Sequence, residues 1–198
     1  MIARLLRQLR RDRRGVTAIE FAFVAPVMCL LIMGLSDMAY QGYVQVILTG
    51  AMQKAGRDST IQGSTGRTDK IDAMVMNMVR SVNKSATFTS SRLNYDSFGN
   101  TGKPEPFQDN NGNGVYDAKT ECFTDMNGNG VWDADRGASG QGGANDVVLY
   151  TVKVNYQRLF PVYGLFGWPQ TATLSATTLL KNQPYASQVT YANLICPK

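Results

Sequence analysis

The stretch at residues 16–36, VTAIEFAFVAPVMCLLIMGLS, decides how this 198-residue chain is organised, because Glu20 is its only charged side chain. An α-helix needs about 20 mostly apolar residues to cross the hydrocarbon core of a bilayer. The stretch therefore predicts one transmembrane helix. Six arginines and one aspartate precede it in residues 1–15, and the positive-inside rule then places that leader in the cytoplasm and residues 37–198 on the far side of the membrane.

Glu20 is unusual because it lies four residues inside this apolar stretch. A carboxylate near the hydrocarbon edge costs about 1–3 kcal/mol, so an acid at this position indicates a functional role. The alternative is a side chain that simply reaches the headgroups. A cleaved secretory signal is disfavoured because no small-x-small cleavage site follows Leu35.

The overall composition excludes several classes of function. The net charge of +5 lies in residues 1–15, while the remaining 183 residues carry 14 basic and 14 acidic side chains, so a nucleic-acid-binding body is not supported. The chain contains no histidine, which excludes Ser-His-Asp and Cys-His catalysis and His-ligated zinc. Since no nucleophile-base pair is visible either, we expect no enzymatic activity.

The run RRGVTAIEFAFVAPV, which begins at Arg13, resembles the TadE-like family of tight-adherence (Flp) pilus assembly proteins, which are type IV pilin-like pseudopilins or minor pilins. Residues 174–185, LSATTLLKNQPY, are similar to a strand near the C-terminus of such proteins. The resemblance implies that a prepilin peptidase cleaves between Gly15 and Val16. It further implies that Glu20, followed by Phe21, acts in assembly by pairing with the new amine of a neighbouring subunit.

The rest of the chain predicts an α+β fold in which a long N-terminal helix packs on a C-terminal antiparallel sheet, as in pilins. Residues 38–59 continue the helical pattern, either as a pilin-like spine or as a helix packed on its own sheet. A second amphipathic helix starts at Thr68–Asp69, and strands are expected at 86–98, 146–159 and 171–181. Between the last two strands lies an apolar loop, FPVYGLFGWP at 160–169. We expect it to cover its own core, with contact to membrane or to a neighbouring subunit as the alternatives.

An internal repeat of 16 residues occupies the insertion at 105–136, where the pattern D-x-N-x-N-G-x-x-D occurs twice. This pattern is the front half of an EF-hand-like calcium loop and resembles the repeats of dockerins. Glu121 is a plausible closing ligand of the first loop, whereas Asp135 and Arg136 leave the closure of the second open. Two Asn-Gly turns without metal are the alternative. The predicted calcium ligands are Asp109, Asn111, Asn113, the Val115 carbonyl, Asp117 and Glu121 in the first loop, and Asp125, Asn127, Asn129, the Val131 carbonyl, Asp133 and Asp135 in the second.

The chain has three cysteines, and their redox state depends on the compartment in which each lies. Cys29 lies in the apolar stretch, where a thiol usually acts as a small hydrophobe. Cys122 and Cys196 have no metal-ligand spacing, and they either form a disulfide outside the cytoplasm or remain two free thiols.

These observations predict a single-pass inner-membrane protein with a basic leader (1–15), a membrane helix (16–36) and a periplasmic or extracellular domain (37–198). As a minor pilin or pseudopilin it would assist, prime or cap a tight-adherence pilus, with prepilin peptidase, other pilins, the assembly machinery of the inner membrane and the membrane itself as partners, and calcium as cofactor. The alternative is a bitopic calcium-dependent binding or adhesion protein that stays outside the pilus.

Overall fold

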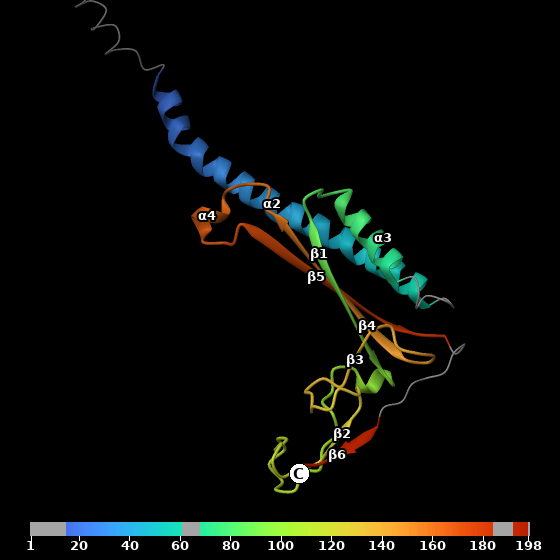
Figure 1. Ribbon diagram of the computed structural model, residues 1–198. Coiled ribbons are helices and arrows are strands. Elements are labelled where there is room, and N and C mark those ends of the chain that lie inside the picture. The colour runs from blue at the N-terminus through green and yellow to red at the C-terminus, as the bar shows by residue number, and fades with distance from the viewer. Residues whose placement is uncertain (1–14, 61–67, 184–191, 198) are drawn as a thin grey trace, which may run out of the picture. The chain divides into compact units, whose positions relative to one another are not determined.

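The computed structural model describes residues 15–60, 68–183 and 192–197 of the chain (Figure 1). Most of the predicted leader, residues 1–14, lies outside the described residues. The elements follow one another as α2 (Val16–Thr60), α3 (Thr68–Arg80), β1 (Thr87–Tyr95), η2 (Phe98–Asn100), β2 (Phe123–Asp125), β3 (Ala138–Ser139), β4 (Val147–Gln157), α4 (Tyr163–Phe166), β5 (Thr171–Lys181) and β6 (Asn193–Ile195).

The chain forms two compact units. The first contains the described residues up to Tyr43 together with Gln157–Ala172, and the second contains Val44–Tyr156 and the described residues from Thr173 onwards. Helix α2 therefore begins in the first unit and ends in the second.

In the first unit, α2 exposes an apolar surface. The helix starts directly after Gly15, whose carbonyl accepts a hydrogen bond from the Ile19 amide at 3.1 Å, and Pro26 lies within it. In the described part of the chain it is the one helix long and apolar enough to cross a membrane, and its most apolar window has a mean hydropathy of 2.3 with none of its residues buried. The large exposed side chains along it are Ile19, Phe21, Phe23, Val24, Val27, Met28, Leu30, Leu31, Ile32 and Leu35.

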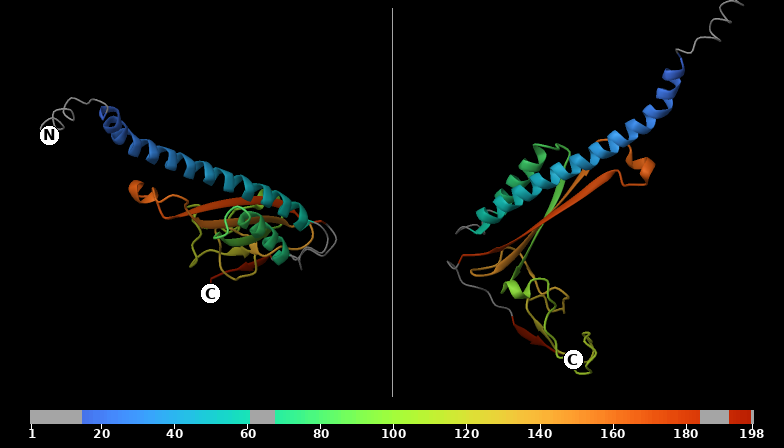
Figure 2. Two further views of the ribbon diagram at one scale, coloured as in Figure 1. Left: turned by 90° about the horizontal axis from the view of Figure 1, so that it is seen from above. Right: turned by 180° about the vertical axis from the view of Figure 1, so that it is seen from behind.

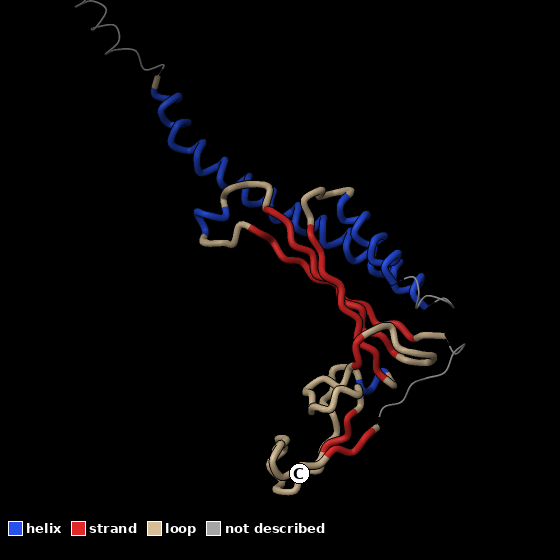
Figure 3. The backbone as a smooth tube through the Cα atoms, viewed as in Figure 1, coloured by secondary structure: helices blue, strands red, loops and turns tan. Residues whose placement is uncertain are grey.

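In the second unit, a four-stranded sheet has the order β3-β1-β4-β5; strands are drawn in red in Figure 3. Strands β1 and β4 pair antiparallel from Thr87 opposite Asn155 to Tyr95 opposite Val147. The even-numbered residues of β4 between Val148 and Tyr156 are buried, as expected for a strand with one face on a core. Helix α3 and the second half of α2 lie on the same side of this sheet (Figure 1).

The second half of α2 packs on its own sheet, which is one of the two arrangements expected for residues 38–59. Val44, Leu48 and Ala55 are fully buried. The Gln45 side chain donates to the Ser175 carbonyl of β5 at 3.1 Å, and a Cβ added at Gly56 would come within 3.4 Å of Thr178. The predicted α+β fold with a long N-terminal helix and an antiparallel sheet is confirmed.

Helix α3 is attached to the sheet through Asp72. Its carboxylate accepts from both arms of the Arg92 guanidinium, from the Ser90 hydroxyl at 2.6 Å and from the Tyr150 hydroxyl at 2.5 Å. Arg92 also stacks over the Tyr150 ring at 4.0 Å. Burial opposes ionisation of Asp72, but the Arg92, Ser90 and Tyr150 donors outweigh it and lower the pKa of this carboxyl. Burial and the adjacent Asp72 raise the pKa of Tyr150.

The apolar loop between β4 and β5 does not cover a core along its length, so that expectation was wrong for most of the loop. Val162 is buried, but Leu159, Leu165, Phe166 and Trp168 are exposed. The loop contains the short helix α4 and belongs to the first unit (Figure 2).

Candidate functional site: paired acidic loops and an adjoining pocket

The first acidic loop, residues 109–117, is organised around the carboxylate of Asp109. This carboxylate accepts from the backbone amides of Gly112 at 2.7 Å and Gly114 at 2.8 Å. Asp117 accepts from the side-chain amide of Asn111 at 2.8 Å. Gly112 and Gly114 have φ values of 72° and 73°, which a side chain would disfavour. The two glycines therefore allow the chain to wrap around the aspartate.

The second acidic loop, residues 125–133, repeats this geometry. Asp125 accepts from the amides of Gly128 at 2.7 Å and Gly130 at 2.8 Å. Asp133 accepts from the side-chain amide of Asn127 at 2.8 Å. Each interaction has the length of its counterpart 16 residues earlier, so the sequence repeat is also a structural repeat.

Glu121 closes the first loop and is fully buried. One of its carboxylate oxygens accepts from the Asn110 amide at 3.0 Å, and the other accepts from the Asp117 amide at 2.9 Å. The side chain therefore holds the second and ninth positions of the loop at a fixed separation.

Glu105 performs the same function in the second loop. It is 1% exposed, and its carboxylate oxygens accept from the amides of Met126 at 2.7 Å and Asp133 at 3.1 Å. These are again the second and ninth positions. Glu105 and Glu121 occupy equivalent positions of the repeat, and each closes the loop of the other repeat unit. Glu105 was not among the predicted site residues, although its alignment with Glu121 in the 16-residue repeat identifies its position.

Asp135, predicted as a ligand of the second loop, has other partners. Its carboxylate accepts from the Tyr95 hydroxyl at 2.9 Å and from the Gly137 amide at 3.1 Å. Burial and this carboxylate raise the pKa of Tyr95 to about 12. Asp135 therefore connects the second loop to strand β1.

Four aromatic rings, also at equivalent positions, join the two loops. The Tyr116 and Trp132 rings are stacked with centroids 5.0 Å apart. Phe107 meets Tyr116 edge-on at 5.8 Å, and Phe123 meets it at 5.5 Å. Phe107 and Phe123 also form an antiparallel bridge. The two repeats, residues 105–136, thus share a small apolar core and form one loop unit.

A disulfide joins Cys122 of the loop unit to Cys196. Strand β2 pairs antiparallel with β6 beside it, from Phe123 opposite Ile195 to Asp125 opposite Asn193. Cys29 is free and exposed on α2. The C-terminal strand is therefore attached covalently next to the second loop.

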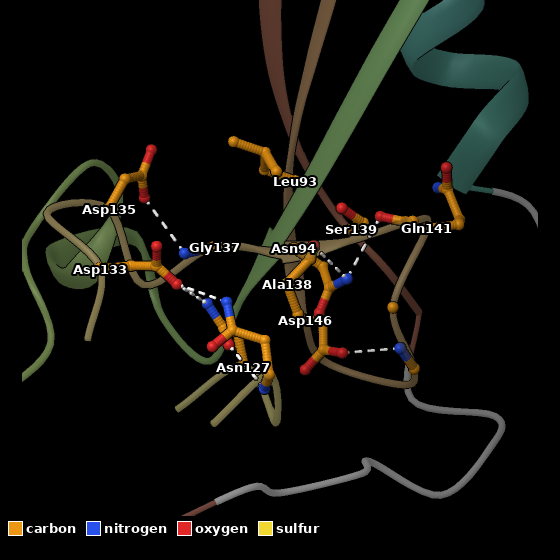
Figure 4. Close-up of a pocket in the computed structure, with 14 residues that line it drawn as sticks. Leu93, Asn94, Asn127, Asp133, Asp135, Gly137, Ala138, Ser139, Gln141 and Asp146 are labelled. Carbon is orange, nitrogen blue, oxygen red and sulfur yellow. Dashed lines mark hydrogen bonds between the residues drawn. The ribbon is translucent and has the colours of Figure 1, made fainter. Parts of the chain in front are cut away.

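An open pocket of about 680 Å³ lies between the second loop and the end of β1 (Figure 4). Asp133, Asp135 and Asp146 line it, and none of its described lining residues is basic. Gly142 is required here, since it has φ of 66° and a Cβ would approach Asp146 to 2.5 Å. The pocket is accordingly acidic, and it offers carboxylate and amide oxygens rather than a nucleophile and base.

The electrostatics of the region favour cations. Residues 96–146 carry nine acidic and three basic side chains. The Gly114 amide, with those of Gly112, Asn113 and Asn111, outweighs desolvation and lowers the pKa of Asp109. In the described residues, no group of three or more Asp, Glu, His or Cys side chains is arranged to hold a metal ion. A cation in either loop would consequently depend on asparagine and backbone oxygens as well as carboxylates.

The residues predicted for cleavage and assembly lie at the start of α2. Gly15 is exposed and immediately precedes the helix, whose first residue is Val16. Glu20 is exposed one turn further, and Phe21 is 68% exposed. Gly15, Glu20 and Phe21 are thus accessible to other molecules at this end of α2. The Val16 side chain lies outside the described part of the structure.

Comparison with known families bears on this end of the chain. Residues 15–57 match the model of the TadE-like protein family. The match begins at the predicted cleavage glycine and ends three residues before the end of α2. It supports a part in tight-adherence pilus assembly, in association with the pilus machinery and the membrane. Comparison with the curated proteins and with the solved structures gave no significant match.

Proposed function

We propose that the protein is a minor pilin or pseudopilin that is cleaved after Gly15 and assists, primes or caps a tight-adherence pilus. The observation that carries the proposal is the family match over residues 15–57, which contains the glycine, the apolar helix and Glu20 in the order that prepilin processing requires. Prepilin peptidase and other pilins are the corresponding partners.

Cleavage changes the chemistry of the helix start. It removes all of the net +5 charge of the chain, which resides in residues 1–15, and creates an ammonium group at Val16. Glu20 lies one turn from this amine on an exposed helix surface. In a low-dielectric environment, a charge pair between subunits is strongly dependent on geometry, so pairing of Glu20 with a neighbour's amine would set the register of assembly.

Calcium stiffening of the extracytoplasmic domain is the second element of the proposal. The Asp109, Asn111, Asn113 and Asp117 side chains and the Val115 carbonyl supply oxygens at the spacing of a calcium loop. Amide donors of Asn111 and Asn113 contact Asp117. A bound cation would replace these donors and draw the amide oxygens inward. Because Glu121 closes the first loop and Glu105 closes the second in the same way, the two loops are equivalent candidate calcium sites.

Two glycines allow a matched test of processing. Neither Gly15 nor Gly34 has an atom within 4 Å of an added Cβ, so alanine fits at both without disturbing the fold. We expect Gly15→Ala to block processing and pilus formation in cells, while Gly34→Ala preserves both. Glu20→Gln should abolish assembly of the processed protein, whereas Glu20→Asp, which retains the charge, should keep part of it. Normal pili with Gly15→Ala and Glu20→Gln would favour the bitopic binding protein instead.

A further inference from the structure

The loop at residues 159–168 carries an unusual concentration of exposed apolar side chains. Leu159, Leu165, Phe166 and Trp168 are between 39% and 69% exposed. The Phe166 and Trp168 rings lie 5.3 Å apart, and residues 159–169 contain no charged side chain. Isolated exposed hydrophobic residues are common, but four on one short loop, two of them with their rings in contact, indicate an interaction surface.

This loop is firmly attached to α2. Arg158, at its start, donates to Asp37 at 2.6 Å, and the Asp37 side chain is 2% exposed. The Arg158 side chain also donates to the Pro169 carbonyl at 3.1 Å, and its guanidinium lies 5.3 Å from the centre of the Trp168 ring. One arginine therefore closes both ends of the loop and fixes them beside Asp37, within the first unit of the chain.

The position of Asp37 along α2 determines where the loop lies relative to a membrane. Asp37 follows Val16 by 21 residues, and at 1.5 Å per residue the helix rises about 32 Å between them. The hydrocarbon core of a bilayer is about 30 Å thick. A helix that enters the membrane at Val16 therefore leaves it at Asp37, on the side opposite the basic leader.

We propose that the 159–168 loop docks on the outer leaflet of the membrane that α2 spans, with Leu165, Phe166 and Trp168 among the headgroups and the first acyl carbons. Tryptophan and tyrosine prefer this level of the bilayer. The Arg158–Asp37 pair fixes the loop at the first charged side chain that follows Glu20 along α2, where the uncharged apolar stretch ends. A second contact with the bilayer would hold the helix at one depth. The inference rests on the membrane insertion of α2 in the proposed function.

The two tryptophans of the chain, Trp132 and Trp168, make the test direct. The full-length protein is reconstituted in phosphatidylcholine–phosphatidylglycerol vesicles in which part of the phosphatidylcholine carries bromine near the top or near the end of its acyl chains. In the Trp132→Phe protein, the Trp168 emission should shift to the blue and be quenched more by the upper bromines. In the matched Trp168→Phe protein, Trp132 should not be quenched.

A third protein separates failure of this inference from failure of membrane insertion. Phe23 lies on the exposed apolar part of α2, and the Phe23→Trp substitution in a chain that lacks both native tryptophans provides a helix reporter of membrane depth. Quenching of this helix reporter without quenching of Trp168 would overturn the docking of the loop alone. Blue-shifted but unquenched Trp168 emission at high protein density would overturn it in favour of contact with a second subunit. An unquenched helix reporter would overturn both the docking and the membrane span.

Discussion

Replacement of the two buried glutamates by glutamine tests the reciprocal closure of the acidic loops. Glu105 and Glu121 each accept two backbone amides through a carboxylate that is at most 1% exposed. Glutamine has the same shape but offers one acceptor oxygen and places an NH₂ group opposite the other amide. One charge-assisted hydrogen bond is lost, and the backbone amide that it held faces the new NH₂ group without an acceptor for either donor.

The magnitude follows from these two losses. A hydrogen bond to a charged group contributes about 1.5–3 kcal/mol, and an unsatisfied buried group costs about 1–3 kcal/mol. Since glutamine keeps a neutral bond to one amide, we expect each substitution to lower the free energy of unfolding of the loop unit by about 3 kcal/mol. The equivalent contacts predict similar losses for Glu105→Gln and Glu121→Gln.

Urea unfolding of the full-length protein in detergent micelles measures this loss. Trp132 stacks on Tyr116 inside the loop unit, so its emission reports the unit once Trp168 is replaced by phenylalanine. Asp96→Asn is the matched control, because Asp96 is exposed and its carboxylate accepts from the nearby Asn100 side-chain amide at the surface. We expect a control loss of no more than about 0.5 kcal/mol. Glutamine variants as stable as the control would show that the two carboxylates do not hold the loops closed. A large difference between Glu105→Gln and Glu121→Gln would show that the two loops are not equivalent.

Three further predictions concern calcium, pH and the disulfide. Calcium at a hundredfold excess over its dissociation constant should stabilise the protein by about 2.7 kcal/mol. Asp109→Ala and Asp125→Ala should each remove a similar part of this stabilisation. Equal melting temperatures in EDTA and in millimolar calcium would exclude a metal role for the loops. The pKa of Asp72 is lowered in the folded protein, so the unfolded chain takes up this proton first as the pH falls, and the stabilisation that is fully present above about pH 4–5 is lost below it. The free energy of unfolding should therefore fall less steeply at acid pH in Asp72→Asn than in the native protein. The same pH dependence in both proteins would contradict this role of Asp72. Reduction of the Cys122–Cys196 bond, which closes a separation of 74 residues, should cost about 4 kcal/mol on the chain-entropy model, and identical denaturation midpoints with and without reductant would contradict this.

The parts of the fold that the sequence predicted are those with strong local patterns. The apolar stretch and the helical spacing beyond it predicted α2, and the β-branched run TATLSATTLLK predicted the bounds of β5, Thr171–Lys181. The carboxylate and glycine spacing predicted the two turning loops, because these turns are formed by contacts three to five residues apart. In each case, the information is contained within a few neighbouring residues.

The contacts that Glu105 and Arg158 make with distant residues were not predicted. Glu105 binds amides 21 and 28 residues further along the chain, and only the folded pair of repeats brings them together. Arg158 and Asp37 are separated by 121 residues, and each alone is an ordinary charged side chain. The apolar composition of residues 160–169 favoured a covered loop, but this ion pair holds the loop next to α2 with Phe166 and Trp168 exposed. A burial preference by itself does not show whether the apolar partner is protein or lipid.

The mature N-terminus shows whether the chain is processed as a pilin. The protein is purified from the membranes of cells with an active prepilin peptidase, and its intact mass and N-terminal sequence are determined by mass spectrometry. We expect a chain that begins at Val16, four residues before Glu20. Gly15→Ala should retain the leader, while Gly34→Ala should be processed normally. Recovery of the membrane protein with residues 1–15 still attached would contradict this expectation.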